Sequence, residues 1–465
     1  MKTININPIT RVEGHGKLTL KLDDSGHVTD ALFCVQEFRG FEKFLEGALA
    51  ENLPMLTARI CGICPVSHHL ASVKAIEACF GTQIPPAAVK LREMLLLSQV
   101  LESHILSLAV LSLPDLVLPD SAPQQRNIAG LYETNQEAVQ RALTLRGIGT
   151  AVGQTVGRRA GMPIGARVGG MVMPLREEER QALLTKLSAA GPHLVWFAKF
   201  FRDLVEKNGE VFETLGDIQT AYMGLVRDQR PAFYDGEVQV IRPDASVAAR
   251  FHGSQYFDYI EEKLENWSYM KFPVLKSGER FRVGPLARVN LVQEMPTPLA
   301  SRELAWFRQR WGRPAHKTLG YHYARLIEAI YAMEHIRELL LDPEITSDVV
   351  CIKPEIKAGV GVGVVEAPRG LLVHRYELDA AAKAVKVDLV VATQHNNYGF
   401  NDALKETAGK LIHNGDPDPA TLNRLEMIVR AYDPCLSCAT HALDAPGFRI
   451  ELVSPEGRIV REWGA

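Results

Sequence analysis

Two short cysteine motifs at opposite ends of the chain decide how it must fold: RICGICPVSH (residues 59–68) and DPCLSCATH (residues 433–441). Each motif supplies two thiols, Cys61 and Cys64 in the first, Cys435 and Cys438 in the second. Four thiolates form a soft, electron-rich ligand set that selects zinc, nickel or iron–sulfur metals. Because the motifs lie about 370 residues apart, a shared metal site requires the two ends of the chain to meet.

The 465 residues have an ordinary globular composition, with 46% apolar and 23% charged residues. A net charge of −3 gives no electrostatic attraction to nucleic acid or to anionic membranes. No run of about 18 apolar residues and no signal sequence is found, so we expect no membrane span and no export. Seven cysteines are too few, and odd in number, for a disulfide framework. Reduced, metal-binding thiols and a cytoplasmic location are favoured.

The spacing of apolar residues predicts a predominantly helical α+β fold, with a large helical core and peripheral β hairpins and sheets. Residues 17–32 alternate apolar and polar side chains around an Asp/Ser/Gly turn, which predicts a hairpin. Strand-like patterns recur at residues 236–258 and 359–391. Helices are expected at residues 86–113, 136–156, 177–207, 319–341 and 420–432.

A CxxC motif alone has other interpretations. One is a redox-active pair of the thioredoxin type, but that pair follows a strand in a small βαβ domain, and residues 55–60 are only weakly strand-like. Another is a structural zinc site, but zinc ribbons place their two pairs roughly 15–20 residues apart. A long-range structural zinc site stays open.

The residues that flank the cysteines favour tuned, metal-bound thiolates. Arg59 and His68 bracket the first pair, where a cation and a hydrogen-bond donor stabilise negative sulfur. We assign His68 a supporting role beside the metal ligands. Pro434 restricts the backbone before the second pair, and His441 lies three residues after Cys438.

The two motifs together resemble those of the large subunit of nickel–iron hydrogenases. The likeness covers nearly the whole chain and includes TRVEGH (residues 10–15), FRGFE (38–42) and EAPRG (366–370). Residues 267–273 and 430–442 are most similar to the cytoplasmic, bidirectional, NAD-reducing group. The resemblance implies a catalytic subunit that reversibly splits H2 into protons and electrons.

The resemblance implies a nickel–iron centre whose iron carries CO and two cyanide ligands. Cys61 and Cys435 match the terminal nickel thiolates, and Cys64 and Cys438 match the thiolates that bridge nickel to iron. Heterolytic cleavage of H2 needs a Lewis acid for the hydride and a base for the proton. A metal and a metal-bound thiolate can supply these two functions, so Cys435 is also a catalytic residue.

Two further catalytic residues follow from the resemblance. Glu13 matches the carboxylate that relays protons from the terminal cysteine, and a buried carboxyl with a raised pKa suits that task. From the residues alone, Glu13 could equally be a structural partner of Arg11. Arg369 matches the guanidinium over the open metal face, and its five donors suit an anionic site. The alternative is a solvent-facing turn arginine after Pro368.

Further site residues are implied in the same way. Glu42 and His441 match ligands of a nearby Mg2+ or Fe2+ ion, with a backbone carbonyl at residues 396–398 as a third ligand. Asp433 and Asp115 match acidic residues that cover the centre.

The chain itself lacks the residues for electron transfer to a nucleotide. Beyond the four motif cysteines only Cys34, Cys79 and Cys351 remain, so no iron–sulfur cluster has its ligands here. The glycine runs at residues 147–157 and 359–363 do not match the dinucleotide fingerprint, and we interpret them as turns and close packing. An iron–sulfur small subunit is therefore required, with a flavin- and NAD-binding diaphorase module if the NAD-reducing subgroup is right.

The last 24 residues, 442–465, predict a strand–turn–strand unit, which could be a permanent edge hairpin. In the resembling family a nickel-dependent endopeptidase removes such an extension once nickel-insertion factors have loaded the metal. We therefore expect cleavage between His441 and Ala442. Residues 1–441 would then form a single intertwined catalytic domain.

Rival functions remain open from the sequence. A cofactor-less structural subunit of respiratory complex I has no use for four cysteines. A slow, non-catalytic H2 sensor shares the metal motifs. Within the enzyme class, an NADP-linked or deazaflavin-linked partner competes with NAD.

Overall fold

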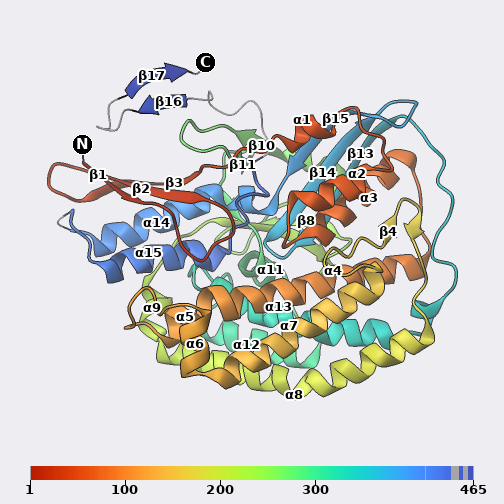
Figure 1. The fold of residues 1–465 in the computed structure, drawn as a ribbon, viewed down its shortest axis with the longest axis horizontal. Helices are drawn as coiled ribbons and strands as arrows, with labels where there is room; N and C mark the ends of the chain where they lie inside the picture. Colours follow the sequence, from red (N-terminus) through yellow and green to blue (C-terminus); the bar gives the residue numbers. More distant parts are fainter. Residues whose placement is uncertain (1, 414, 441–449, 454–458, 464–465) are drawn as a thin grey trace.

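The computed structural model describes residues 2–413, 415–440, 450–453 and 459–463 (Figure 1). Long helices form one side of the molecule, and the larger sheets with their covering helices form the other. This mixed α+β architecture agrees with the predicted fold class.

The helical layer is built around α13, which is buried along most of its length. Helix α4 packs against both α7 and α13, while α8 lies against α7 and α13, and α12 covers α13. These helices are α4 (Pro86–Leu106), α7 (Gln136–Gly157), α8 (Glu177–Lys207), α12 (Pro298–Trp311) and α13 (Gly320–Leu341). An apolar helix without a polar face is expected at the centre of a large core, and α13 fits that description.

Helix α4 continues through a π-helical turn, η2 (Ser107–Ser112), into α5 (Leu113–Val117). The stretch Pro86–Val117 is long and apolar enough to cross a membrane, with a mean hydropathy of 1.7. However, 78% of its most apolar window is buried inside the protein. Because α4 packs against α7 and α13, this stretch is a core helix by its contacts.

An N-terminal sheet joins β1 (Lys2–Ile6), β2 (Gly16–Leu22) and β3 (Val28–Val35) in the order β1-β2-β3, all antiparallel. The predicted hairpin at residues 17–32 is thus confirmed as β2 and β3. Alternate residues of β2 are buried, and β3 packs against α14 (Asn397–Leu411). Helix α15 (Pro419–Tyr432) lies beside α14 and leads directly to the second cysteine motif.

A second antiparallel sheet lies over the helix that follows the first cysteine motif. Its strands are β13 (Gly359–Ala367), β14 (Gly370–Leu378) and β15 (Ala384–Val390), and the helix is α3 (Pro65–Phe80). Glycines allow the close approach: a Cβ atom at Gly361 would lie 2.0 Å from the Ala75 oxygen, and one at Gly363 would lie 2.1 Å from the Ala71 oxygen. The glycine run therefore serves close packing, as predicted.

A third sheet has five strands, in which β12 pairs parallel with β6 and the other pairs are antiparallel. Its strands are β6 (Ala221–Arg227), β7 (Arg230–Pro231), β8 (Glu237–Ile241), β9 (Val247–His252) and β12 (Phe281–Arg282).

The remaining elements connect the helical layer and the sheets. They are α1 (Phe41–Leu45), α2 (Leu53–Thr57), η1 (Ala58–Ile60), α6 (Ile128–Thr134), β4 (Ala166–Arg167), β5 (Gly170–Met171), α9 (Gly209–Thr214), η3 (Gly253–Gln255), α10 (Tyr256–Tyr259), β10 (Ile260–Lys263), β11 (Phe272–Leu275), α11 (Pro285–Leu291), η4 (Pro343–Thr346), η5 (Ala392–Asn396), β16 (Ile450–Val453) and β17 (Ile459–Trp463).

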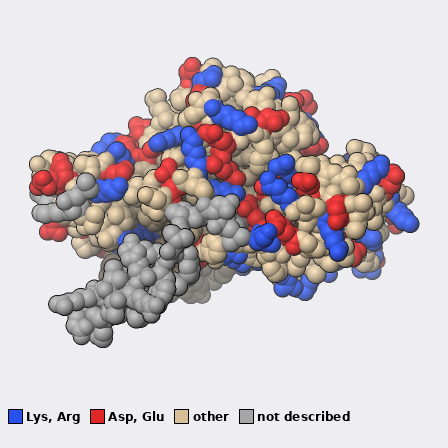
Figure 2. Space-filling view, turned by 90° about the horizontal axis from the view of Figure 1, so that it is seen from above, with Lys and Arg blue, Asp and Glu red and all other residues tan. Residues whose placement is uncertain are grey.

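The surface carries both signs of charge. On the face shown in Figure 2, lysine and arginine side chains are interspersed with aspartate and glutamate. This mixture agrees with the small net charge of −3.

Candidate metal centre

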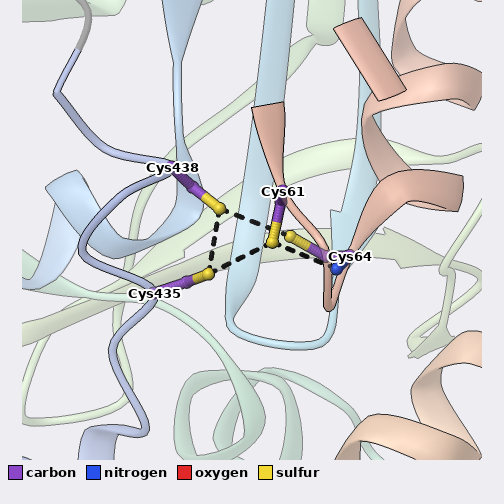
Figure 3. Close-up of side chains that lie close together, drawn as sticks. All are labelled: Cys61, Cys64, Cys435 and Cys438. Carbon is purple, nitrogen blue, oxygen red and sulfur yellow. Dashed lines mark hydrogen bonds between the residues drawn. The ribbon is translucent and has the colours of Figure 1, made fainter. Parts of the chain in front are cut away.

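The structure brings the four motif cysteines together in the interior (Figure 3). Their sulfur atoms all lie within 4.8 Å of one another, and all four residues are buried. The sulfur of Cys435 lies 3.3 Å from that of Cys61 and 2.9 Å from that of Cys438, and the sulfurs of Cys64 and Cys438 are 3.7 Å apart. The two ends of the chain therefore meet at one potential ligand set.

Local backbone geometry aims the first pair inward. Cys61 is extended after η1, and Cys64 caps the N-terminus of α3, where Pro65 occupies the first helical position. The backbone amides of Ile63 and Cys64 point at the Cys61 sulfur, at 3.3 Å and 3.1 Å. These amide donors stabilise negative charge on that sulfur.

The second pair is positioned by the end of α15. Asp433 ends the helix in the left-handed conformation, with φ of 56°, which aspartate tolerates better than most residues. The turn redirects the chain toward the first motif. The Cys435 amide then donates to Thr393 Oγ1 at 3.0 Å, which holds the motif against η5.

An N-terminal loop lies directly on the second motif. Glu13 forms a parallel backbone bridge with Cys435, and the Leu436 amide donates to the Glu13 backbone oxygen at 3.2 Å. Gly14 makes the contact feasible, because a Cβ atom there would lie 2.8 Å from Leu436 Cβ and its φ is +83°. The half-buried Glu13 carboxylate accepts hydrogen bonds from the Ser437 hydroxyl and, at 3.2 Å, from the Ser437 amide.

Arg39 connects the two motifs to each other. Its side chain donates to the Ile60 backbone oxygen, immediately before Cys61, and to the Ser437 backbone oxygen at 3.2 Å. Its own amide donates to the Thr440 oxygen at 3.1 Å. The Arg39 guanidinium thus binds the backbone of both cysteine motifs and holds them together.

The protonation states of the four thiols depend on one another. Hydrogen bonds from Cys435, Cys438 and Cys61 lower the pKa of Cys64 well below its ordinary value, and His68 makes a smaller contribution. The contact with Cys438 raises the pKa of Cys435, and burial raises the pKa of Cys438. Four close thiolates need a compensating cation, so the ligand set is suited to a metal.

Comparison with known proteins agrees with this geometry. A family model for nickel-dependent hydrogenases matches residues 39–144 and 218–441, and a HoxL-like model matches residues 3–38. This chain belongs to the nickel-dependent hydrogenases. It is the large subunit of a nickel–iron hydrogenase.

Several relatives are similar over almost their full length. The chain is 40% identical to one subunit of the vhc F420-non-reducing hydrogenase of Methanococcus voltae, covering 95% of this chain and 96% of the relative. It is 37% identical to the NAD-reducing hydrogenase HoxS subunit beta of Cupriavidus necator, covering 98% of both. A crystal structure of an NAD+-reducing [NiFe]-hydrogenase in the H2-reduced state matches with a TM-score of 0.91 and 36% identity, over 95% of this chain and all of that chain.

Within this hydrogenase fold, Arg369 is buried beside the cysteines. Its Nε donates to the Asp433 backbone oxygen at 2.5 Å, and its guanidinium pairs with Asp433 Oδ1 at 3.0 Å and contacts Ser103 Oγ at 3.3 Å. Burial alone would lower the pKa of Arg369, but Asp433 and the cysteine thiolates hold it well above its usual value. The solvent-facing alternative for Arg369 is therefore wrong.

A buried ion network supports the loop that carries Arg369. Its centre is Arg288, which is fully buried and forms two 2.6 Å hydrogen bonds to Glu328 and one to Glu366. Arg288 also donates to the backbone oxygens of Ala367 at 3.1 Å and Pro368 at 3.0 Å. These hydrogen bonds hold the turn before Arg369 in position.

Asp115 lies in a second buried ion cluster. It pairs with Arg11 at 2.5 Å and with Arg430 Nε at 3.0 Å, and it accepts from Asn423 at 3.3 Å. Arg11 thus takes Asp115 as its partner, while Glu13 bonds to Ser437. Among the described residues, Arg11 does not pair with Glu13, so the structure does not contain the alternative arrangement that the sequence left open.

Glu42, in α1, contacts the end of β15 and Lys271. It accepts from the Leu389 amide at 2.8 Å and pairs with Lys271 at 3.2 Å, and Lys271 also pairs with Glu262 at 3.0 Å. Burial opposes the charge on Lys271, but Glu262 and Glu42 together raise its pKa. Burial raises the pKa of Glu262 to about 7. His441, the other predicted ligand, lies outside the described residues.

Sequence reasoning assigned no role to several residues that the fold places against the candidate site residues or their supporting loops: Arg39, Lys271, Arg288, Arg325 and His374. Arg325 had a detectable signal, because it interrupts an apolar helix three residues after His322 and three before Glu328. Its Nε lies 3.8 Å from Asp433 Oδ2, and no nitrogen of its guanidinium has a hydrogen-bond partner among the described residues. Arg39 and Lys271 lie in the stretches 38–42 and 267–273 that carry the family resemblance, but nothing in those stretches indicated their individual contacts. Arg288 and His374 had no sequence pattern to mark them.

Proposed function

We propose that this subunit carries out the reversible heterolytic cleavage of H2 and passes the electrons through an iron–sulfur small subunit to NAD+. The observation that carries the proposal is the cluster of four buried thiol sulfurs, drawn from both ends of the chain, within 4.8 Å of one another.

The residues fit a nickel–iron centre. Soft thiolates suit both metals, and Cys61, Cys64, Cys435 and Cys438 would hold them. Guanidinium groups suit anionic ligands such as cyanide, and the buried Arg325 has donor nitrogens without a partner in the described part of the chain. When bound, the centre supplies the Lewis acid for the reaction.

The protein's own residues handle the proton. The Cys435 thiolate is the proposed base, and Glu13 is the proposed next acceptor, because its backbone pairs with Cys435 and its carboxylate bonds to Ser437. Arg369 and Asp433 form a buried ion pair over the sulfurs, which would orient the open face of the centre. Asp115 would complete this acidic cover.

Two supporting sites are proposed beside the centre. Glu42 and His441, with a carbonyl from residues 396–398, would hold a Mg2+ or Fe2+ ion. Hard oxygen donors suit such an ion, and the described part of the chain provides Glu42 together with the buried Glu262 Oε1 and Asn397 Oδ1, both without partners. His68, in α3 one turn after Cys64, would tune the sulfurs.

Electrons would leave where the first motif reaches the surface. Gly62 and Arg59 are exposed, although Cys61 and Cys64 beside them are buried. A partner covering this face would lie close to the sulfurs. The relatives named as NAD-reducing support NAD+ as acceptor. A flavin- and NAD-binding diaphorase module as a further partner, and a cytoplasmic location, are part of the same proposal. Other relatives are named as F420-non-reducing hydrogenases. The test must therefore distinguish NAD+ from a different electron acceptor.

We also propose that residues 442–465 are a maturation segment, removed by an endopeptidase after nickel-insertion factors have loaded the centre. The family model ends at residue 441. Residues 1–441 would remain as the catalytic unit.

The decisive test combines composition and turnover on the purified complex. Equimolar nickel and iron, infrared bands of CO and cyanide, and H2-dependent reduction of NAD+ are expected. Zinc alone would overturn the metal assignment. A normal metal content with very slow turnover would instead indicate an H2 sensor, and H2 oxidation without NAD+ reduction would exclude the NAD+ assignment.

A further inference from the structure

A single turn of α13 carries two charged residues that reach the Arg369–Asp433 ion pair. Arg325 and Glu328 lie three residues apart on this buried helix, so their side chains are neighbours on one face. Glu328 pairs with Arg288, which in turn holds the backbone of the turn before Arg369. Arg325 approaches the acidic partner, with its Nε 3.8 Å from Asp433 Oδ2. One helical turn therefore supports both members of the ion pair.

The Arg369–Asp433 pair uses only one oxygen of the carboxylate. Arg369 Nη2 donates to Asp433 Oδ1 at 3.0 Å, and Nε donates to the Asp433 backbone oxygen at 2.5 Å. The third nitrogen, Nη1, is directed at Ser103 Oγ, 3.3 Å away. Arginine and carboxylate groups frequently pair through two parallel hydrogen bonds. Here Asp433 Oδ2 makes no hydrogen bond to any described residue.

Arg325 is the charged group that faces this second oxygen. Its side chain is fully buried, and none of its three guanidinium nitrogens has a hydrogen-bond partner in the described part of the chain. Burial lowers the pKa of Arg325 to about 10, although Asp433 opposes the shift, so the group is charged at neutral pH. A separation of 3.8 Å is too long for a hydrogen bond, but it gives a strong attraction between buried charges.

We propose that Arg325 is a positioning residue, whose charge holds Asp433 Oδ2 and so keeps Arg369 on Oδ1 alone, with Nη1 directed at Ser103. The inference rests on the proposed function, in which Arg369 lies over the open face of the metal centre. Without the Arg325 charge, both oxygens of Asp433 would turn to the Arg369 fork. The Arg369 guanidinium would then rotate, and Nη1 would leave Ser103.

Packing and charge balance do not explain an arginine at this position. A guanidinium without hydrogen bonds costs free energy inside an apolar helix, whereas an unbranched apolar side chain of similar length would pack there at a lower cost. Asp433 does not need Arg325 for neutralisation, because Arg369 already pairs with it. A second cation is explained if the orientation of the carboxylate matters.

Arg325→Met tests the proposal in the intact hydrogenase complex. Crystal structures should show one oxygen of Asp433 on Arg369 in the wild type and both oxygens in the variant. The kcat for H2 oxidation, expressed per bound nickel, should fall on the order of 10²-fold, as expected when a group at the reaction site is misplaced by about 1 Å. The KM for H2 should change little, because H2 accepts no hydrogen bond from a guanidinium.

Arg325→Lys separates the charge from the shape of the side chain. Lysine keeps a positive charge facing Asp433 Oδ2 but lacks the planar fork of arginine. It should keep the pairing through one oxygen and restore most of the wild-type kcat. If the lysine and methionine variants lost the same activity, with one-oxygen pairing in both, the charge on Arg325 would have no positioning role.

Arg92→Met is the matched control for the loss of a buried arginine. Arg92 is fully buried and forms two 2.7 Å hydrogen bonds to Glu77. Its replacement also leaves a buried carboxylate unpaired, so stability and yield should fall. The kcat per bound nickel should stay near the wild-type value. An equal fall of kcat in Arg92→Met and Arg325→Met would overturn the proposal.

A further variant covers the case in which Arg325→Met does not accumulate. Arg325→Gln keeps a donor for Asp433 Oδ2 but removes the charge, so pairing through both oxygens and a smaller fall in kcat are expected. Wild-type pairing and kcat in this variant would overturn the proposal.

The wild-type complex separates this inference from the proposed function. A wild-type crystal structure in which Arg369 already binds both oxygens of Asp433 would overturn the inference alone. A wild-type complex without nickel and iron would overturn the proposed function and the inference together.

Discussion

At the residue scale, Glu13 is the proposed first proton acceptor beyond the cysteines. Glu13→Gln keeps the shape and the hydrogen bond to Ser437 but cannot carry a proton. We expect H2 oxidation to fall by roughly 10²–10⁴-fold, the usual contribution of a positioned acid–base group. Metal content and CO bands should be unchanged, as measured by elemental analysis and infrared spectroscopy.

Glu37→Gln is the matched control for Glu13. Glu37 follows β3, lies beside the loop that carries Glu13, and accepts from His15 Nδ1 at 2.7 Å. Its replacement should leave turnover near the wild-type rate. If Glu13→Gln were as active as Glu37→Gln, the proton would have to leave by another group.

Glu366 makes a prediction about pH and stability. Burial raises the pKa of Glu366 to about 7, although Arg288 opposes the shift. A carboxyl with a folded pKa above its unfolded value destabilises the protein as pH rises from about 4.5 to 7, because the folded state binds more protons there. Glu366→Gln removes this dependence. The free energy of unfolding of the variant relative to wild type should rise by up to about 3 kcal/mol between pH 5 and 8.

Urea titrations of the two proteins at several pH values measure this difference. Comparing variant with wild type cancels the groups that they share. A difference that stays flat, or falls with pH, would show that Arg288 keeps Glu366 ionised throughout this range.

At the element scale, the N-terminal loop and the second cysteine motif depend on Gly14. Gly14→Ala adds a Cβ atom 2.8 Å from Leu436 Cβ at a φ of +83°. We expect about 1–3 kcal/mol lower stability from overpacking, beyond the backbone strain itself, and lower nickel retention. Gly47→Ala isolates the strain, because Gly47 has a φ of +84° and nothing within 4 Å of its Cβ position. Equal losses in both variants would show that the loop contact does not hold the motif.

The C-terminal segment is the other element with a testable fate. Strands β16 and β17 form the predicted hairpin and pair with each other. We expect intact-mass analysis of active enzyme to show a chain ending at His441. The unprocessed chain should accumulate when nickel is withheld. Active enzyme that still ends at Ala465 would contradict the maturation proposal.

Regular elements were predictable where their periodicity was long. Helix α8 (Glu177–Lys207) has the predicted bounds, and α13 and α15 differ from prediction by one residue. The stretch at 86–113 was predicted as one helix, but π-helical η2 interrupts it at Ser107–Ser112. Apolar periodicity does not encode such a local change in hydrogen bonding. At residues 236–258 only β8 and β9 are strands, because the pattern there is short.

At the scale of the whole molecule, the proposed electron path requires partners. The isolated subunit should not reduce NAD+ with H2, and the complex with its iron–sulfur and diaphorase subunits should. Masking the face around Gly62 and Arg59, by a Gly62→Trp change, should weaken small-subunit binding in pull-down and sedimentation assays. NAD+ reduction by this polypeptide alone would refute the requirement for partners.

The sequence by itself determined the type of chemistry. Thiol spacing, the motif residues around it and the long helices are local properties, and local patterns are visible in a sequence. Only the tertiary structure decided which side chains surround the sulfurs. Arg39 clamps both motifs, Arg288 supports the Arg369 turn, and His374 reaches His68 from a strand 306 residues away. Such contacts depend on how helices and sheets pack, and single buried polar residues leave no periodic trace along the chain.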